Sequence, residues 1–194
     1  MFAKIKKEFF DCCKLFMVGV VLLTVCGVML PVQAAIKEVP AAFIVQDYTG
    51  EMEGADYRNW KQVTRWAYRF PYYHLEDGAV LAPARKLLDV KQIDKELLDR
   101  AVKSVQSDVL VLVRVYDMTE RIDTSMGSME YGPVVKVEVE ADLYCYRADT
   151  GKLLVDNVYE RGVYDMGAYE RPCDTIRWRL CDLVNKMEGR SLIR

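Results

Sequence analysis

One strongly apolar stretch constrains the fold of this chain more than any other feature. Residues 108–116 read Asp-Val-Leu-Val-Leu-Val-Arg-Val-Tyr, and five consecutive apolar side chains leave the segment without a polar face. Such a run predicts a central strand that is covered on both sides, and its valines favour a strand over a short buried helix. Alternation returns at Arg114, so we expect the strand to emerge from its cover towards its end.

The remaining periodicities predict further elements around this strand. Residues 135–145 alternate strictly between apolar and polar, which predicts one buried and one solvated face, and the turn at 149–152 returns the chain as a hairpin. Further strands are predicted at 41–48, 72–75 and 153–164. Helices are predicted at 56–70 (capped by Asp56), 83–90 (a short helix or part of one), 94–105 and 172–187. The mostly polar residues 117–132 predict a long loop. The fold class is therefore α/β (α+β), a single layered domain with a mixed or antiparallel sheet of about four or five strands and packed helices.

The first 34 residues have the order of a secretory signal. Four lysines precede the uncharged apolar run 15–30, and Pro31 and the small or modest residues Val-Gln-Ala at 32–34 follow it. This order predicts a signal peptide at 1–34, cleaved after Ala34, and a domain at 35–194. As a helix the run would span roughly 24 Å, short of the about 30 Å of a hydrocarbon core. The alternatives are an uncleaved membrane anchor at residues 15–30 and lipidation at Cys26, which ends a Leu-Thr-Val-Cys segment.

The charge balance of the predicted mature chain argues against nucleic acid as a partner. Removing residues 1–34, which carry four basic and two acidic side chains, leaves 23 Lys plus Arg and 27 Asp plus Glu. Phosphate binding requires a concentrated basic face, whereas these arginines are scattered among acids. We expect membrane contact only if residues 15–30 are retained.

The cysteines and the histidine limit disulfide and metal chemistry. Cys173 and Cys181 lie eight residues apart in a predicted helix, about 12 Å along its axis, too far to pair. Cys145 can pair with either one, or all three can be buried thiols. No Cys-x-x-Cys pair is present and His74 is the only histidine, so the sequence predicts neither a metal site nor a cofactor.

The acidic residues before the first helix give the only catalytic alternative. Glu51, Glu53 and Asp56 lie together and could serve a carboxylate-based hydrolase, with His74 as an assisting group. The competing interpretation is that these acids solvate a turn and cap the helix. The sequence favours this second interpretation and a protein that is not an enzyme.

The aromatic residues around the first helix suggest a binding surface instead. Seven aromatics fall between Tyr57 and Tyr73, both included, and aromatic side chains are frequent at contact surfaces. The polar loop adds methionines, which adapt to different partners. The predicted binding face, for an unidentified protein partner, combines the following residues: Trp60, Trp66, Tyr72, Tyr73, Met126 and Met129.

The order of the elements resembles a family of exported α/β domains. A buried Ser-Asp-Val-Leu-Val-Leu-Val strand at 107–113, a hairpin turning at Asp-Thr-Gly-Lys-Leu-Leu (149–154) and a closing helix resemble the family that includes the amino-terminal domain of TolB and the curli-secretion lipoprotein CsgG. In that family an aspartate often leads the central strand, as Asp108 does here. The resemblance covers most of residues 41–188 and carries over no functional residue. It implies a non-catalytic, extracytoplasmic module of the cell envelope or secretion machinery that binds protein.

The signal prediction is tested by the intact mass of the protein isolated from its native host. We expect a chain that begins at Ala35, because a signal peptidase reads the small residues before that position. A full-length mass would contradict cleavage and make residues 15–30 an anchor. A mass beginning at Cys26 with added lipid would identify a lipoprotein.

Overall fold

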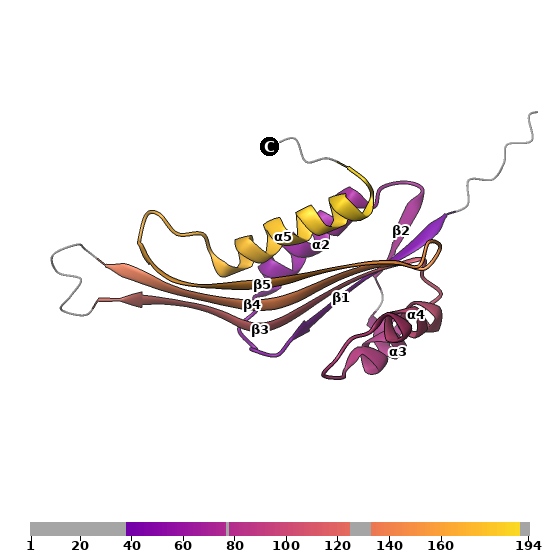
Figure 1. Ribbon diagram of the computed structural model, residues 1–194, viewed down its shortest axis with the longest axis horizontal. Helices are drawn as coiled ribbons and strands as arrows, with labels where there is room; N and C mark the ends of the chain where they lie inside the picture. The colour runs from indigo at the N-terminus through magenta and orange to yellow at the C-terminus, as the bar shows by residue number, and fades with distance from the viewer. Residues whose placement is uncertain (1–37, 77, 125–132, 191–194) are drawn as a thin grey trace, which may run out of the picture. The chain divides into compact units, whose positions relative to one another are not determined.

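The computed structural model describes residues 38–76, 78–124 and 133–190 of the 194-residue chain. The predicted signal at 1–34, Met126 and Met129 lie outside the described residues. Five strands form one sheet in the order β2-β1-β3-β4-β5 (Figure 1). The strands are β1 Val39–Asp47, β2 Tyr72–Leu75, β3 Val109–Asp123, β4 Val134–Arg147 and β5 Lys152–Asp165. The helices of the described part are α2 Gly54–Ala67, α3 Gly78–Leu88, α4 Lys95–Ser104 and α5 Pro172–Met187.

The sheet is mixed, which confirms the predicted fold class. β1 runs parallel to β2 and β3, whereas β3, β4 and β5 run antiparallel to their neighbours. The hairpin between β4 and β5 turns at Gly151, whose φ of 61° a residue with a side chain rarely adopts. Helices lie on both sides of the sheet, α2 and α5 on one face and α3 and α4 on the other (Figure 1).

β3 is buried on both faces over its first half, as predicted. Val109, Val111 and Val113 pack under α2 and α5, whereas Leu110 and Leu112 pack under α3 and α4. All five side chains are almost wholly inaccessible to solvent. The helical layer on each face therefore follows from the lack of a polar face in this strand.

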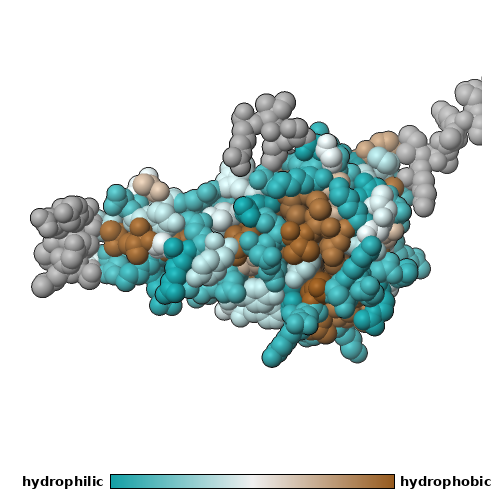
Figure 2. Space-filling model, in the orientation of Figure 1, coloured by the Kyte–Doolittle hydropathy of each residue, from teal (hydrophilic) through white to brown (hydrophobic). Residues whose placement is uncertain are grey.

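The second half of β3 corrects the predicted loop. The strand continues to Asp123 with a register shift between Val115 and Asp117, so residues 117–123 are strand rather than loop. Polar side chains are tolerated in this strand because α3 and α4 pack against the first half of β3 and do not cover residues 117–123. At this end of the sheet, on the left in Figure 2, hydrophilic surface surrounds a small hydrophobic patch.

Arg114 does not emerge into solvent as the alternation suggested, since only 3% of it is exposed. Its guanidinium donates hydrogen bonds to the Tyr48 hydroxyl at 2.7 Å and to the carbonyl oxygens of Val90 at 2.7 Å and Lys91 at 3.3 Å. The group also lies 5.3 and 5.6 Å from the ring centroids of Tyr48 and Tyr116. The arginine therefore ties β3 to the connection between α3 and α4.

Two helices begin earlier than predicted. α2 begins at Gly54 because Glu53, not Asp56, is its cap, and the Asp56 carboxylate accepts a hydrogen bond from the Glu53 backbone N–H at 3.2 Å. α2 also ends at Ala67, three residues before the predicted end. α3 begins at Gly78 rather than Pro83, because its apolar stripe extends upstream to Leu81. α5 has the predicted bounds, 172–187.

Two tryptophans of α2 provide a matched test of this helix register. Trp60→Ala should lower the free energy of unfolding by about 3–5 kcal/mol, because it empties a fully buried site. Trp66→Ala removes a largely exposed side chain of the same helix and should change it by less than about 0.5 kcal/mol. Urea unfolding followed by circular dichroism measures both. Equal losses in the two variants would contradict the register.

Candidate binding site

The structure separates the residues of the predicted binding face. Trp60 is wholly buried, and its Nε1 donates to the Cys173 carbonyl at 2.9 Å, so it belongs to the core and not to a surface. Its place follows from the helical repeat, which puts positions 56, 60, 64 and 67 on the stripe that faces the sheet and turns position 66 roughly 120° away from position 60. Trp66 is 63% exposed. One of the two tryptophans can therefore contact a partner.

Tyr72 and Tyr73 cannot share a surface with each other. They are consecutive in β2, so their side chains point to opposite faces of the sheet. Tyr72 is half-buried and its ring packs edge-on against that of Tyr68, with centroids 5.1 Å apart. Tyr73 is exposed on the other side. Of the predicted residues that the structure describes, only Trp66 lines the groove described next.

A groove of about 540 Å³ lies between α2 and α5. α2 and the residues after it contribute Val63, Trp66, Ala67 and Arg69; α5 and its end contribute Arg177, Trp178, Cys181, Val184, Asn185 and Arg190. On α5, positions 177, 181, 184 and 185 follow the helical repeat that places them on one stripe. The groove thus arises because each helix turns one stripe to the sheet and a second stripe to its neighbour.

Two tryptophans and several arginines give the groove its chemical character. Trp178 is 55% exposed, and the Arg177 guanidinium lies 4.7 Å from its ring centroid, a cation–π contact. Arg177 also pairs with Asp174 at 3.2 Å. Arg69 and Arg190 form no ion pair within the described residues. The groove therefore combines an apolar floor with an excess of positive charge.

Sequence reasoning missed Trp178, although a signal was available. The apolar face of the last helix carries Ile176, Leu180 and Leu183, and Trp178 lies off that face. A large aromatic side chain on the polar side of an amphipathic helix indicates a contact surface. What the sequence could not supply is the packing of α5 beside α2, which brings Trp178 and Trp66 to the same groove.

The acids of the catalytic alternative line a second, polar hollow of about 310 Å³ together with Glu120, Arg171 and Cys173. Glu51, Glu53 and Asp56 all border it, but His74 does not. His74 lies on β2, where its Nε2 is 2.9 Å from the Tyr68 carbonyl oxygen and burial lowers its pKa. The structure therefore does not bring His74 into the hollow that the three carboxylates border.

Two of the acids around this hollow, Asp56 and Glu120, have structural partners. Asp56 is buried and accepts the Glu53 backbone N–H in the capping box of α2. Glu120 accepts a hydrogen bond from the Tyr169 hydroxyl at 2.7 Å and lies 3.7 Å from Arg171. These contacts fit the interpretation that the acids hold the turn and the start of α2.

The three cysteines of the described residues are free thiols in this structure, and the disulfide that the sequence allows stays a prediction. Cys145 is buried, with its Sγ 3.2 Å from the Tyr68 hydroxyl, and burial raises the pKa of its thiol to about 12. Burial also raises the pKa of Cys173 to about 12. Cys181 is half-buried in the groove, where burial likewise raises its pKa.

Comparisons with known proteins do not assign the chain to a family. No family model matches the sequence, and no curated protein matches it. A search of solved structures finds the hypothetical protein CT253 from Chlamydia trachomatis at 11% identity and a TM-score of 0.42, covering 79% of this chain and 97% of that one. It also finds the lipoprotein GNA1162 from Neisseria meningitidis at 10% identity and a TM-score of 0.41, covering 79% and 99%.

A third structure is the LpoB C-terminal domain from Salmonella enterica, at 8% identity and a TM-score of 0.33, covering 72% of this chain and 92% of that one. At these values the likenesses leave the family open, and the resemblance to the TolB and CsgG domains stays a prediction. Within the described residues, no helix has the length and apolarity that crossing a membrane requires.

Thiol reactivity tests the cysteine environments. In the folded protein, iodoacetamide at pH 8 should alkylate Cys181 faster than Cys145 and Cys173, because Cys181 is only half-buried whereas the other two thiols are buried and form little thiolate. Peptide mass mapping after timed labelling measures each site, and a denatured sample controls for complete reaction. A peptide containing Cys145 that labels only after reduction would contradict the free thiol.

Proposed function

We propose that this chain is an exported, non-enzymatic binding or assembly module of the cell envelope or extracellular space that acts through protein contacts. The export rests on the signal-like residues 1–34. The observation that carries the binding role is the groove between α2 and α5, where Trp66 and Trp178 stay exposed. Tryptophan and arginine are the side chains most enriched at the centres of protein interfaces.

The chemistry of the groove favours one kind of partner. Two helices that lie side by side leave a channel in which the apolar face of a third helix can dock. Arg69 and Arg190 border this channel without a carboxylate partner in the described part of the chain. We therefore expect an amphipathic helix whose apolar stripe enters the groove and whose flanks carry Asp and Glu.

The exposed basic side chains of α2 and α5 extend this preference beyond the groove. The exposed positions of α2 include Arg58 and Arg65 and no acid, and those of α5 include Arg179 and Lys186. Some of this charge is satisfied, since Arg179 pairs with Asp156 and Arg65 with Glu76. The rest would accelerate the approach of an acidic partner, an effect that salt weakens.

Two alternative functions, a hydrolase and a membrane-anchored interaction protein, would use different parts of the chain. A carboxylate-based hydrolase would use Glu51, Glu53 and Asp56, but the contacts of Asp56 support a capping role. A membrane-anchored interaction protein would keep residues 15–30 and use the same groove. The groove supports protein binding in either case.

A defined peptide pair tests the groove. An amphipathic helical peptide with a leucine stripe flanked by glutamates should bind and change the fluorescence of Trp66 and Trp178, whereas the same peptide with lysines in place of the glutamates should not. Trp66→Ala should weaken binding of the acidic peptide at least about tenfold, the loss typical of an interface hot spot. Arg69→Glu should reduce the affinity for the acidic peptide more at low salt than at high salt, because salt screens the interaction between exposed charges.

The matched control is Val80→Ala, which removes an exposed apolar side chain from α3 on the opposite face. It should leave peptide affinity unchanged. Equal binding of both peptides, or no loss in Trp66→Ala, would contradict the proposal. Vesicles with anionic lipid form the second probe, and Trp66-dependent binding to vesicles but not to the acidic peptide would replace the protein partner with a membrane surface.

A further inference from the structure

β5 ends the sheet and has one strand neighbour. It pairs antiparallel with β4 along its whole length, Lys152–Asp165, and no strand of the described residues pairs with its outer side. A strand of 14 residues at a sheet edge presents a row of backbone N–H and C=O groups that another strand can complete. The length of this edge makes it the strongest candidate for a second interaction surface.

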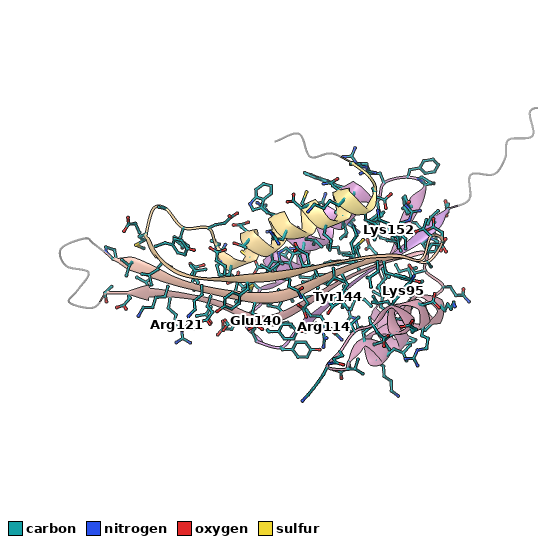
Figure 3. The ribbon with its side chains drawn as sticks, viewed as in Figure 1. Lys95, Arg114, Arg121, Glu140, Tyr144 and Lys152 are labelled. Atoms are coloured by element: carbon teal, nitrogen blue, oxygen red, sulfur yellow. The ribbon has the colours of Figure 1, made fainter. Side chains whose placement is uncertain are left out.

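An interrupted apolar stripe follows this edge on the α3/α4 face. Val155, Tyr159 and Val163 are 46%, 67% and 61% exposed and lie four residues apart, with exposed Asn157 and Arg161 between them on the same face. They share a face because they lie opposite Tyr144, Glu140 and Lys136 of β4. Figure 3 shows Tyr144 and Glu140 on the same side of the sheet as Arg114 and Arg121, below the strands in that view. No described helix packs over this part of the face.

We propose that β5 pairs antiparallel with β5 of a second copy of this chain, about a two-fold axis at Tyr159. The stripe is symmetric about that residue. Tyr159 then faces Tyr159 of the second copy, and Val155 faces its Val163. Directly opposite residues of an antiparallel pair lie on the same face, so each apolar side chain of one stripe faces an apolar side chain of the other. The occupant of the edge is therefore a second β5, which supplies both a hydrogen-bond ladder and a matching stripe.

Charge selects this register over its neighbours. With the axis at Tyr159, Arg161 faces Asn157 and Asp156 faces Gly162, so no like charges are directly opposite. An axis one residue earlier would set Asp156 against Glu160, and an axis one residue later would set Glu160 against itself. Like charges directly opposite destabilise strand pairing.

The path of α5 leaves room for this pairing. Thr175 near its start donates to Glu160 at 3.2 Å, Arg179 pairs with Asp156 at 2.6 Å, and Lys152 donates to the Met187 carbonyl near its end at 3.2 Å. The helix therefore starts beside the proposed axis and runs back towards the start of β5. In the second copy the same helix runs in the opposite direction, so the two helices diverge from the axis.

Cysteine cross-linking tests the register. Tyr159→Cys should form a disulfide-linked dimer under mild oxidation, because directly opposite Cα atoms lie about 4.5–5.5 Å apart. Val155→Cys and Val163→Cys should cross-link when the two chains are mixed and not when each is alone. The full 194-residue chain is expressed. Each variant is assayed in mild detergent as it is purified, whether or not the cell has removed residues 1–34.

The wild-type chain and Gln62→Cys, on the exposed side of α2, give the background from native thiols and random collisions. A dimer band in Gln62→Cys as strong as in Tyr159→Cys would overturn the proposal, as would cross-linking of Val155→Cys alone.

Sedimentation provides a measurement without cysteines. The wild-type protein should be dimeric at about 100 μM, a concentration well above the dissociation constants typical of specific complexes. Tyr159→Lys with Val163→Lys should be monomeric with unchanged circular dichroism, because charge at an edge blocks pairing. Trp66→Ala should remain dimeric, since the groove lies elsewhere. A monomeric wild-type protein at this concentration would overturn the inference.

Discussion

The burial of β3 on both faces is the constraint on which the rest of the structure depends. Its valines require cover from α2 and α5, and its leucines require cover from α3 and α4. Because a strand inside a sheet needs a neighbour on each side, β1 and β4 are partly fixed by the same requirement. Arg114 extends the constraint, since its guanidinium ties this strand to the connection between α3 and α4.

Both proposed contact surfaces lie where this burial is incomplete. α2 and α5 together cover their face of the sheet but leave a groove between themselves, with Trp66 and Trp178 exposed in it. α3 and α4 cover only part of the opposite face, which leaves Tyr159 and its neighbours on β5 exposed. The groove offers apolar surface ringed by positive charge, whereas the edge offers backbone hydrogen bonds and a symmetric stripe. The two surfaces therefore suit different occupants and can act independently.

The candidate site was predicted in part because a count of aromatic residues does not say which of them share a face. The sequence placed Trp60 and Trp66 together on one surface, yet six residues of helix separate their directions by roughly 120°, and the stripe that contains Trp60 packs in the core. Helical spacing alone separates the two tryptophans, whereas packing decides which of them is buried. Trp178 was missed because its groove requires two helices more than a hundred residues apart in the sequence.

The sequence by itself determined the elements with strong local patterns. The apolar run of β3, the strict alternation of β4 and the stripe of α5 each specify how one segment buries its side chains. Tertiary structure decided what depends on neighbours: the extension of β3 through polar residues paired with β4, the burial of Arg114 and the groove between α2 and α5. Local patterns record how much of a segment is buried, whereas only packing decides which neighbour buries it and what remains exposed.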